Sequence, residues 1–214
     1  MQGQFVVYGA KGSGSVAVEA CLTLMDLPYR VIEAAPWGDK TEQALLAKAN
    51  PLGQVPVLEL PDGERMTESA AILIWLTDAF PKAGLAPVPY APERPAFLRG
   101  MSFISAAIYA LYAVRDDPKR WVDGEAAQKQ LVQTCQARMV ACWKTLEGGI
   151  APAPHILGSE LSVLDVYAAV VSRWAPGRTA NLGECPRLAG AVALVDSDPR
   201  LAALWAERFP SPPS

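Results

Sequence analysis

The most informative stretch of this chain is Asn50-Pro51-Leu52-Gly53-Gln54-Val55-Pro56-Val57-Leu58-Glu59-Leu60, which Glu68-Ser69 follows closely. Proline lacks a backbone donor, so Pro56 fits only at the first residue or the edge of the apolar strand that it introduces. An X-Pro bond is also the ordinary place for a cis peptide, which costs only about 0.5–1 kcal/mol there. A cis bond at Val55-Pro56 would turn the N–H and C=O of Val55 outward. We therefore expect this segment to offer its backbone to an extended peptide.

A tight turn and a second short strand follow. Pro61-Asp62-Gly63 has the composition of a turn, and residues 65–66 return the chain toward Glu68. Ser69 precedes an apolar run, so we predict that it is the N-cap of a helix that ends near Phe80. A helix N-terminus binds anions, and the Glu68 carboxylate suits an ammonium group. These groups together suit a small zwitterionic peptide.

The order and spacing of these pieces resemble the glutathione transferases, whose first domain is thioredoxin-like. In that family the residue before the cis-proline pairs with the cysteinyl backbone of glutathione, and a Glu/Asp-Ser pair holds its γ-glutamyl end. The resemblance implies glutathione as a co-substrate, bound by Gln54, Val55, Pro56, Glu68 and Ser69. It is strong over residues 1–80 and looser beyond them.

Hydrophobic periodicity divides the chain into two domains. Strand and helix patterns alternate through residues 1–80 in the β-α-β then β-β-α order of an α/β thioredoxin-like domain. Prolines crowd residues 81–95, which we predict to be a linker. Residues 96–214 carry only helical patterns, so we expect an all-α C-terminal helical bundle domain.

Three patterns define that helical domain. Apolar stripes predict one long helix from Phe97 to Tyr112 and another from Ala126 to Leu146. Ser162-x-x-Asp165 is a capping-box sequence. Glutathione transferases carry this form of the box in the core of their helical domain, so it supports the resemblance from the other half of the chain.

The loop from Gly9 to Ser15 joins the first strand to the first helix, and here the resembling family brings a Tyr, Ser or Cys side chain to the glutathione sulfur. Counting back from Leu27-Pro28-Tyr29 places Ser13 at or within one residue of the serine of the serine-type classes. The resemblance therefore makes Ser13 the predicted catalytic residue. Gly14 occupies the position of the thiol in the cysteine-type classes, which argues against mixed-disulfide chemistry.

Ser15 and Tyr8 are the alternatives for the contact with the sulfur. Ser15 lies directly before Val16 and is predicted to be the N-cap of the first helix. Tyr8 is predicted to be an outward or half-buried strand aromatic.

One hydroxyl donor is enough for this chemistry. A free thiol titrates near 8.5, and lowering its pKa by about 2 units requires about 2.7 kcal/mol. A hydrogen bond to a charged group contributes roughly 1.5–3 kcal/mol, and a helix N-terminus adds about 0.3–1 kcal/mol. Neither a base nor a metal is required.

Composition argues against several other functions. The net charge of −3 leaves no electrostatic footprint for nucleic acid or an anionic membrane. The most apolar stretch, Phe103 to Val114, is shorter than the roughly 20 residues that span a bilayer. The N-terminus has no signal-peptide pattern. The four cysteines lack metal-type or Cys-x-x-Cys spacing, so we expect reduced, mostly buried thiols, no metal and a cytoplasmic location.

Two other functions compete with the transferase. Gly12-x-Gly14-x-x-Ala17, with Glu33 further on, matches part of a dinucleotide-binding fingerprint. The Pro-led hairpin and the helices that follow do not continue such a fold. The second alternative is a non-catalytic binding or assembly protein of the same fold.

The second substrate is the least defined part of the prediction. Tyr109 and Tyr112 are predicted to line a pocket for a small apolar electrophile, and Trp37 and Trp174 are weaker candidates. His155, the single histidine, is predicted to lie in a loop. The family resemblance also implies a homodimer.

Overall fold

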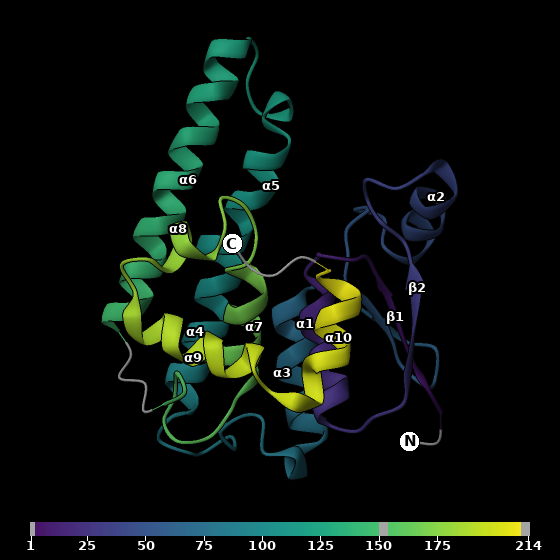
Figure 1. Ribbon diagram of the computed structural model, residues 1–214. Helices are drawn as coiled ribbons and strands as arrows, with labels where there is room; N and C mark the ends of the chain where they lie inside the picture. The colour runs from purple at the N-terminus through teal and green to yellow at the C-terminus, as the bar shows by residue number, and fades with distance from the viewer. Residues whose placement is uncertain (1–2, 150–153, 211–214) are drawn as a thin grey trace.

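A four-stranded mixed sheet forms the centre of the N-terminal domain in the computed structural model, which describes residues 3–149 and 154–210 (Figure 1). The elements of this domain, in chain order, are β1 (Phe5–Gly9), α1 (Ser15–Leu24), β2 (Tyr29–Glu33), α2 (Lys40–Ala49), β3 (Val57–Glu59), β4 (Arg65–Met66) and α3 (Ser69–Ala79).

The strand order is β2-β1-β3-β4. The crossover through α1 makes β1 and β2 parallel, whereas β3 is antiparallel to both β1 and β4. This is the predicted thioredoxin-like topology. The dinucleotide-binding alternative is wrong, because that fold continues with further parallel strands.

Alternation along β1 gives the sheet two apolar faces. Phe5 and Val7 join the large core beneath α1 and α3, whereas Val6 and Tyr8 pack with Leu46 of α2 on the opposite face. Figure 1 accordingly shows α2 on the far side of the sheet from α1 and α3.

The proline-rich segment connects α3 to the helical domain. It contains a 3-10 turn at Pro81–Ala83, and Pro95 lies in the first turn of the next helix rather than in the connection. Arg94 is buried and holds this segment, because its guanidinium donates to the Pro87 carbonyl (2.9 Å) and to Asp78 (2.8 Å).

Apart from one β-bridge between His155 and Gly158, the regular elements described in the C-terminal domain are helical. Its elements are α4 (Arg94–Phe103), a π-helical segment (Ile104–Tyr109), α5 (Ala110–Asp116), α6 (Glu125–Gly148), α7 (Val163–Val171), α8 (Arg178–Leu182), α9 (Pro186–Asp196) and α10 (Ala202–Arg208). Both predicted long helices are present. The sequence did not indicate the π-helical segment inside the first of them.

The continuous helix Arg94–Asp116 is long and apolar enough to cross a membrane by length and composition alone. Residues 103–114 are shorter than a membrane span, but the helix that contains them extends beyond that stretch. Its buried residues, Phe97, Met101, Ile104, Ile108 and Tyr112, belong to the core cluster.

One apolar core joins the two domains. Every residue of α7 is buried, and this helix packs against both α1 and α3. The predicted capping box begins α7: Asp165 accepts hydrogen bonds from the Ser162 N–H (2.9 Å) and the Ser162 hydroxyl (2.6 Å). Helix α10 returns to lie along α1 (Figure 1), so the end of the described chain contacts the N-terminal domain.

Candidate active site

The peptide bond between Val55 and Pro56 is cis, as predicted. The pairing of β3 with β1 begins at Val57, opposite Tyr8, so Val55 lies two residues before the first paired position. Among the described residues, no hydrogen bond uses the backbone N–H or C=O of Val55. These two groups are therefore available to an extended ligand.

Asn50 holds the turn that leads into this segment, a role that the sequence did not reveal. Its side chain is buried, accepts a hydrogen bond from the Leu52 N–H (3.0 Å) and donates to the Gln54 carbonyl (2.9 Å). Gly53 lies between them at φ +61, where glycine is favoured. Gln54 itself is exposed.

Glu68 and Ser69 lie at the start of α3, one position away from the predicted arrangement. Ser69 is the first helical residue and not the N-cap, because Glu68 precedes the helix at φ +66. Non-glycine residues rarely adopt a positive φ, and those that do are often found at functional sites. The Ser69 hydroxyl is buried and lies 2.9 Å from the hydroxyl of Tyr167 in α7. Its partner thus comes from the helical domain.

Ser13 lies at the entry to α1 and is 6% exposed. Its hydroxyl oxygen accepts the Ser15 backbone N–H (3.2 Å) and lies 2.9 Å from the Ser15 hydroxyl. The prediction that Ser15 is the N-cap is wrong, because Ser15 is the first residue of α1 and Gly14 precedes it. The Ser15 hydroxyl instead accepts the Ala10 N–H (3.2 Å) and donates to Glu19 (2.9 Å).

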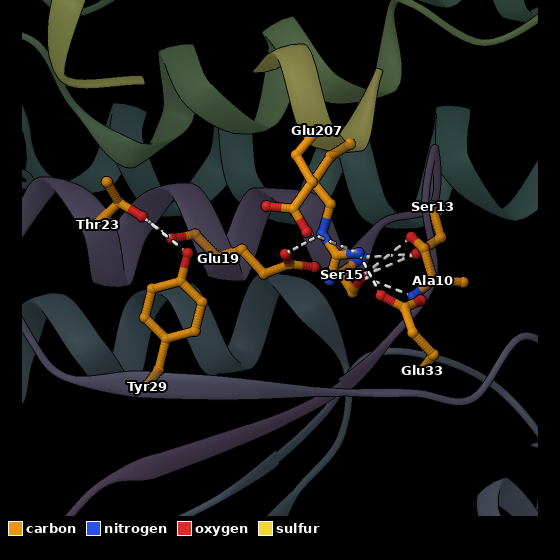
Figure 2. Close-up of polar contacts among 9 residues, drawn as sticks. Ala10, Ser13, Ser15, Glu19, Thr23, Tyr29, Glu33 and Glu207 are labelled. Atoms are coloured by element: carbon orange, nitrogen blue, oxygen red, sulfur yellow. Dashed lines mark hydrogen bonds and ion pairs between the residues drawn. The ribbon is translucent and has the colours of Figure 1, made fainter. Parts of the chain in front are cut away.

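A buried charge network continues from Ser15 (Figure 2). Arg208 of α10 donates to Glu19 at 2.5 Å, and both side chains are 1% exposed. Arg208 also pairs with Glu33 at the end of β2. Burial raises the pKa of Glu19, and the Arg208 guanidinium opposes that shift. Sequence reasoning missed this network, because Glu19 and Arg208 are 189 residues apart.

Tyr109 and Trp174 bring the helical domain against the same loop. The Tyr109 ring packs edge-on against Trp174 (ring centroids 4.7 Å apart), and the Trp174 indole N–H donates to the Gly12 carbonyl at 2.6 Å. A Cβ added at Gly14 would lie 2.3 Å from the Tyr109 hydroxyl oxygen. Glycine at this position is therefore what allows the phenol to reach the N-terminus of α1.

The other aromatic candidates occupy different environments. Tyr112 is only 3% exposed, and its hydroxyl accepts from the Asn181 amide at 3.2 Å, so it faces the protein interior and not an open pocket. Trp37 is exposed on the loop after β2. Tyr8 is more buried than predicted, and its hydroxyl donates to Glu59 (3.3 Å) on the α2 side of the sheet. That position directs it away from Ser13.

The remaining candidate groups lie outside this site. His155 lies in a short turn closed by backbone hydrogen bonds with Gly158. All four cysteines are free and buried. No group of three or more potential metal ligands occurs among residues 3–149 and 154–210. Two surface cavities, of about 480 and 350 Å³, are lined by other residues of the linker and the helical domain.

The fold and this site define a class of protein: a thioredoxin-like domain with a cis-proline before β3, joined to an all-helical domain. The profile described as glutathione S-transferase, N-terminal domain, matches residues 15–79. The uncharacterized GST-like protein YncG of Escherichia coli K12 is 33% identical over 172 residues, which cover 80% of this chain and 82% of that protein. The chain belongs to the glutathione S-transferase family.

Other similar proteins carry glutathione transferase names. Glutathione S-transferase GST-4.5 of Xanthomonas campestris is 25% identical over 79% of this chain and 81% of that protein. A crystal structure of a glutathione transferase homolog from Sulfitobacter, with bound glutathione, is 26% identical, has a TM-score of 0.83 and covers 95% of this chain and 98% of that one. A beta-class glutathione S-transferase from Sphingomonas chungbukensis has the same fold, with a TM-score of 0.76, 23% identity and coverage of 95% and 98%.

Proposed function

We propose that this protein is a glutathione transferase that activates the glutathione thiolate for attack on a small apolar electrophile. The Val55 backbone pairs with the cysteinyl unit, while Glu68 and the first amides of α3 hold the ammonium and carboxylate of the γ-glutamyl end. This assignment places the sulfur at the N-terminus of α1, beside Ser13.

One observation carries this proposal: three separate elements converge on one place. The unpaired Val55 backbone lies two residues before Val57, which pairs with Tyr8 near the end of β1. Glu68 is close enough to Tyr109 to raise the pKa of its phenol, and the same phenol lies over Gly14. The peptide edge, the start of α3 and the start of α1 would therefore surround one extended ligand. A bound anion at the N-terminus of α3 is favoured by the helix dipole and by the first amides of that helix.

The reaction needs no group beyond these. Ionisation of the thiol releases a proton to water, and the thiolate then forms a C–S bond with the electrophile. In a substitution the leaving group departs with the electron pair of the broken bond. Holding both reactants in the cleft lowers the entropic part of the barrier.

Isothermal titration calorimetry with glutathione, combined with turnover of a chlorodinitrobenzene, tests the proposal. We expect binding and conjugation in the wild type, and a loss of affinity in Glu68→Gln. Lys11→Ala, an exposed change in the loop before α1, is the matched control. No binding of glutathione would refute the proposal. Binding without turnover across a panel of electrophiles and peroxides would support the non-catalytic alternative.

We also propose a homodimer, as the family resemblance implies. Val88, Tyr90 and Leu98 expose apolar side chains on the linker and on α4, which provides surface for such a contact. Sedimentation equilibrium measures the mass directly, and a monomer at micromolar concentration would contradict this part of the proposal.

A further inference from the structure

The hydroxyl hydrogen of Ser13 is used in a hydrogen bond inside the protein. Glu19 forms an ion pair with the buried Arg208 guanidinium, and the oxygens of a paired carboxylate accept hydrogen bonds. Ser15 therefore donates its single hydroxyl hydrogen to Glu19 at 2.9 Å, in preference to the Ala10 carbonyl at 3.4 Å.

This orientation settles the direction of the next hydrogen bond. Ser13 and Ser15 lie 2.9 Å apart through their hydroxyl oxygens, and geometry alone allows either to donate. Since the hydrogen of Ser15 is already given to Glu19, Ser13 must donate to Ser15. Ser13 also accepts the Ser15 N–H. Figure 2 shows these bonds converging on Ser15, from Ala10, Ser13 and Glu19.

The Tyr109 hydroxyl has a hydrogen free to donate, whereas the Ser13 hydroxyl does not. Its oxygen lies in the space that a side chain at Gly14 would fill, next to the N-terminus of α1. Among the described residues, no hydrogen bond uses the Tyr109 hydroxyl as donor, whereas the neighbouring Tyr112 and Tyr167 hydroxyls have partners. Burial raises the pKa of Tyr109, so its phenol stays protonated at neutral pH.

The surrounding structure fixes the position of this phenol. Tyr109 is the last residue of the π-helical segment, a distortion found frequently at functional sites. Trp174 packs against its ring and is bonded to Gly12 of the loop. The hydroxyl therefore points at the N-terminus of α1 from across the domain boundary.

We propose that Tyr109, and not Ser13, donates the hydrogen bond that stabilises the thiolate of bound glutathione. This inference rests on the proposed function and names the activating residue of that site. Tyr109 keeps its own proton, and the thiol proton leaves to water. Activation then depends on contact between the two domains, because the peptide is held by one domain and its sulfur by the other.

The test measures the pKa of the bound thiol from thiolate absorbance as a function of pH. Tyr109→Phe removes only the hydroxyl, so we expect that pKa to rise by about 1–2 units, with the Kd for glutathione changed less than about three-fold. Ser13→Ala should leave the bound-thiol pKa within about 0.5 units of the wild type. Tyr29→Phe is the matched control, since its hydroxyl bonds to Thr23 at the other end of α1 (Figure 2).

Gly14→Ala provides a second route if Tyr109→Phe does not fold. Gly14 has φ −65, which alanine adopts freely, so its added methyl acts only by displacing the phenol. It should raise the bound-thiol pKa as Tyr109→Phe does. A pKa shift in Ser13→Ala, with none in Tyr109→Phe or Gly14→Ala, would overturn the inference and leave the proposed function intact. Absence of glutathione binding in the wild type would overturn the proposed function itself.

Discussion

The variant Arg208→Met tests whether the buried Arg208–Glu19 pair holds α10 against α1. Both side chains are 1% exposed, so methionine would leave the Glu19 carboxylate buried without its counter-charge. Removing one partner of a buried pair costs about 3–5 kcal/mol. In a chain of 214 residues each kcal/mol shifts the melting temperature by about 2–4 °C, so we expect a fall of about 6–20 °C.

The loss of stability in Arg208→Met should depend on pH. Burial already raises the pKa of Glu19 in the wild type, and Arg208 opposes that shift. In Arg208→Met the opposition is gone, so the folded-state pKa rises further above the unfolded value of about 4.3. A raised pKa means that stability is retained below the unfolded pKa and lost as pH rises through the folded pKa. The deficit of the variant should therefore be largest near neutral pH and shrink toward about pH 4.5.

Thermal unfolding followed by circular dichroism at about pH 5 and about pH 8 measures both effects. Adding Glu19→Gln to Arg208→Met removes the unpaired charge and should restore part of the stability. Arg200→Met is the matched control, because Arg200 is 55% exposed and its pair with Asp198 is worth only about 0–1 kcal/mol. An Arg208→Met loss no larger than that of the control, or a loss independent of pH, would refute the reasoning.

Three further predictions concern the turn before Val55, the capping box and Cys21. Asn50→Ala removes two side-chain hydrogen bonds from the turn before Val55, and calorimetry should show glutathione affinity reduced roughly ten-fold; an unchanged Kd would contradict this. Asp165→Ala removes three hydrogen bonds to a buried carboxylate, so urea unfolding should show a loss of about 3 kcal/mol, against about 1 kcal/mol for Ser162→Ala; equal losses would count against it. Burial raises the pKa of Cys21, which should therefore resist alkylation in the folded protein when labelling is followed by mass spectrometry, and rapid labelling without unfolding would disprove this.

Short-range patterns predicted the N-terminal domain well. The proline at residue 56, the turn after it and the apolar run after Ser69 each act within a few residues, and the sheet that they predict is present. Two of their predictions are wrong by one position. Ser15 and Ser69 are each the first residue of a helix rather than its N-cap, and their hydroxyls bond to Glu19 and Tyr167.

The amino-acid sequence alone determined the fold, the family and the position of the cis-proline, because strand alternation, turn chemistry and capping depend on neighbouring residues. Only the tertiary structure decided which hydroxyl has a free hydrogen. That depends on Arg208 meeting Glu19 and Trp174 meeting Gly12, contacts that join residues 189 and 162 positions apart. An amphipathic pattern shows which face of a helix is buried, but the partner of that face is chosen by the packing of the whole chain.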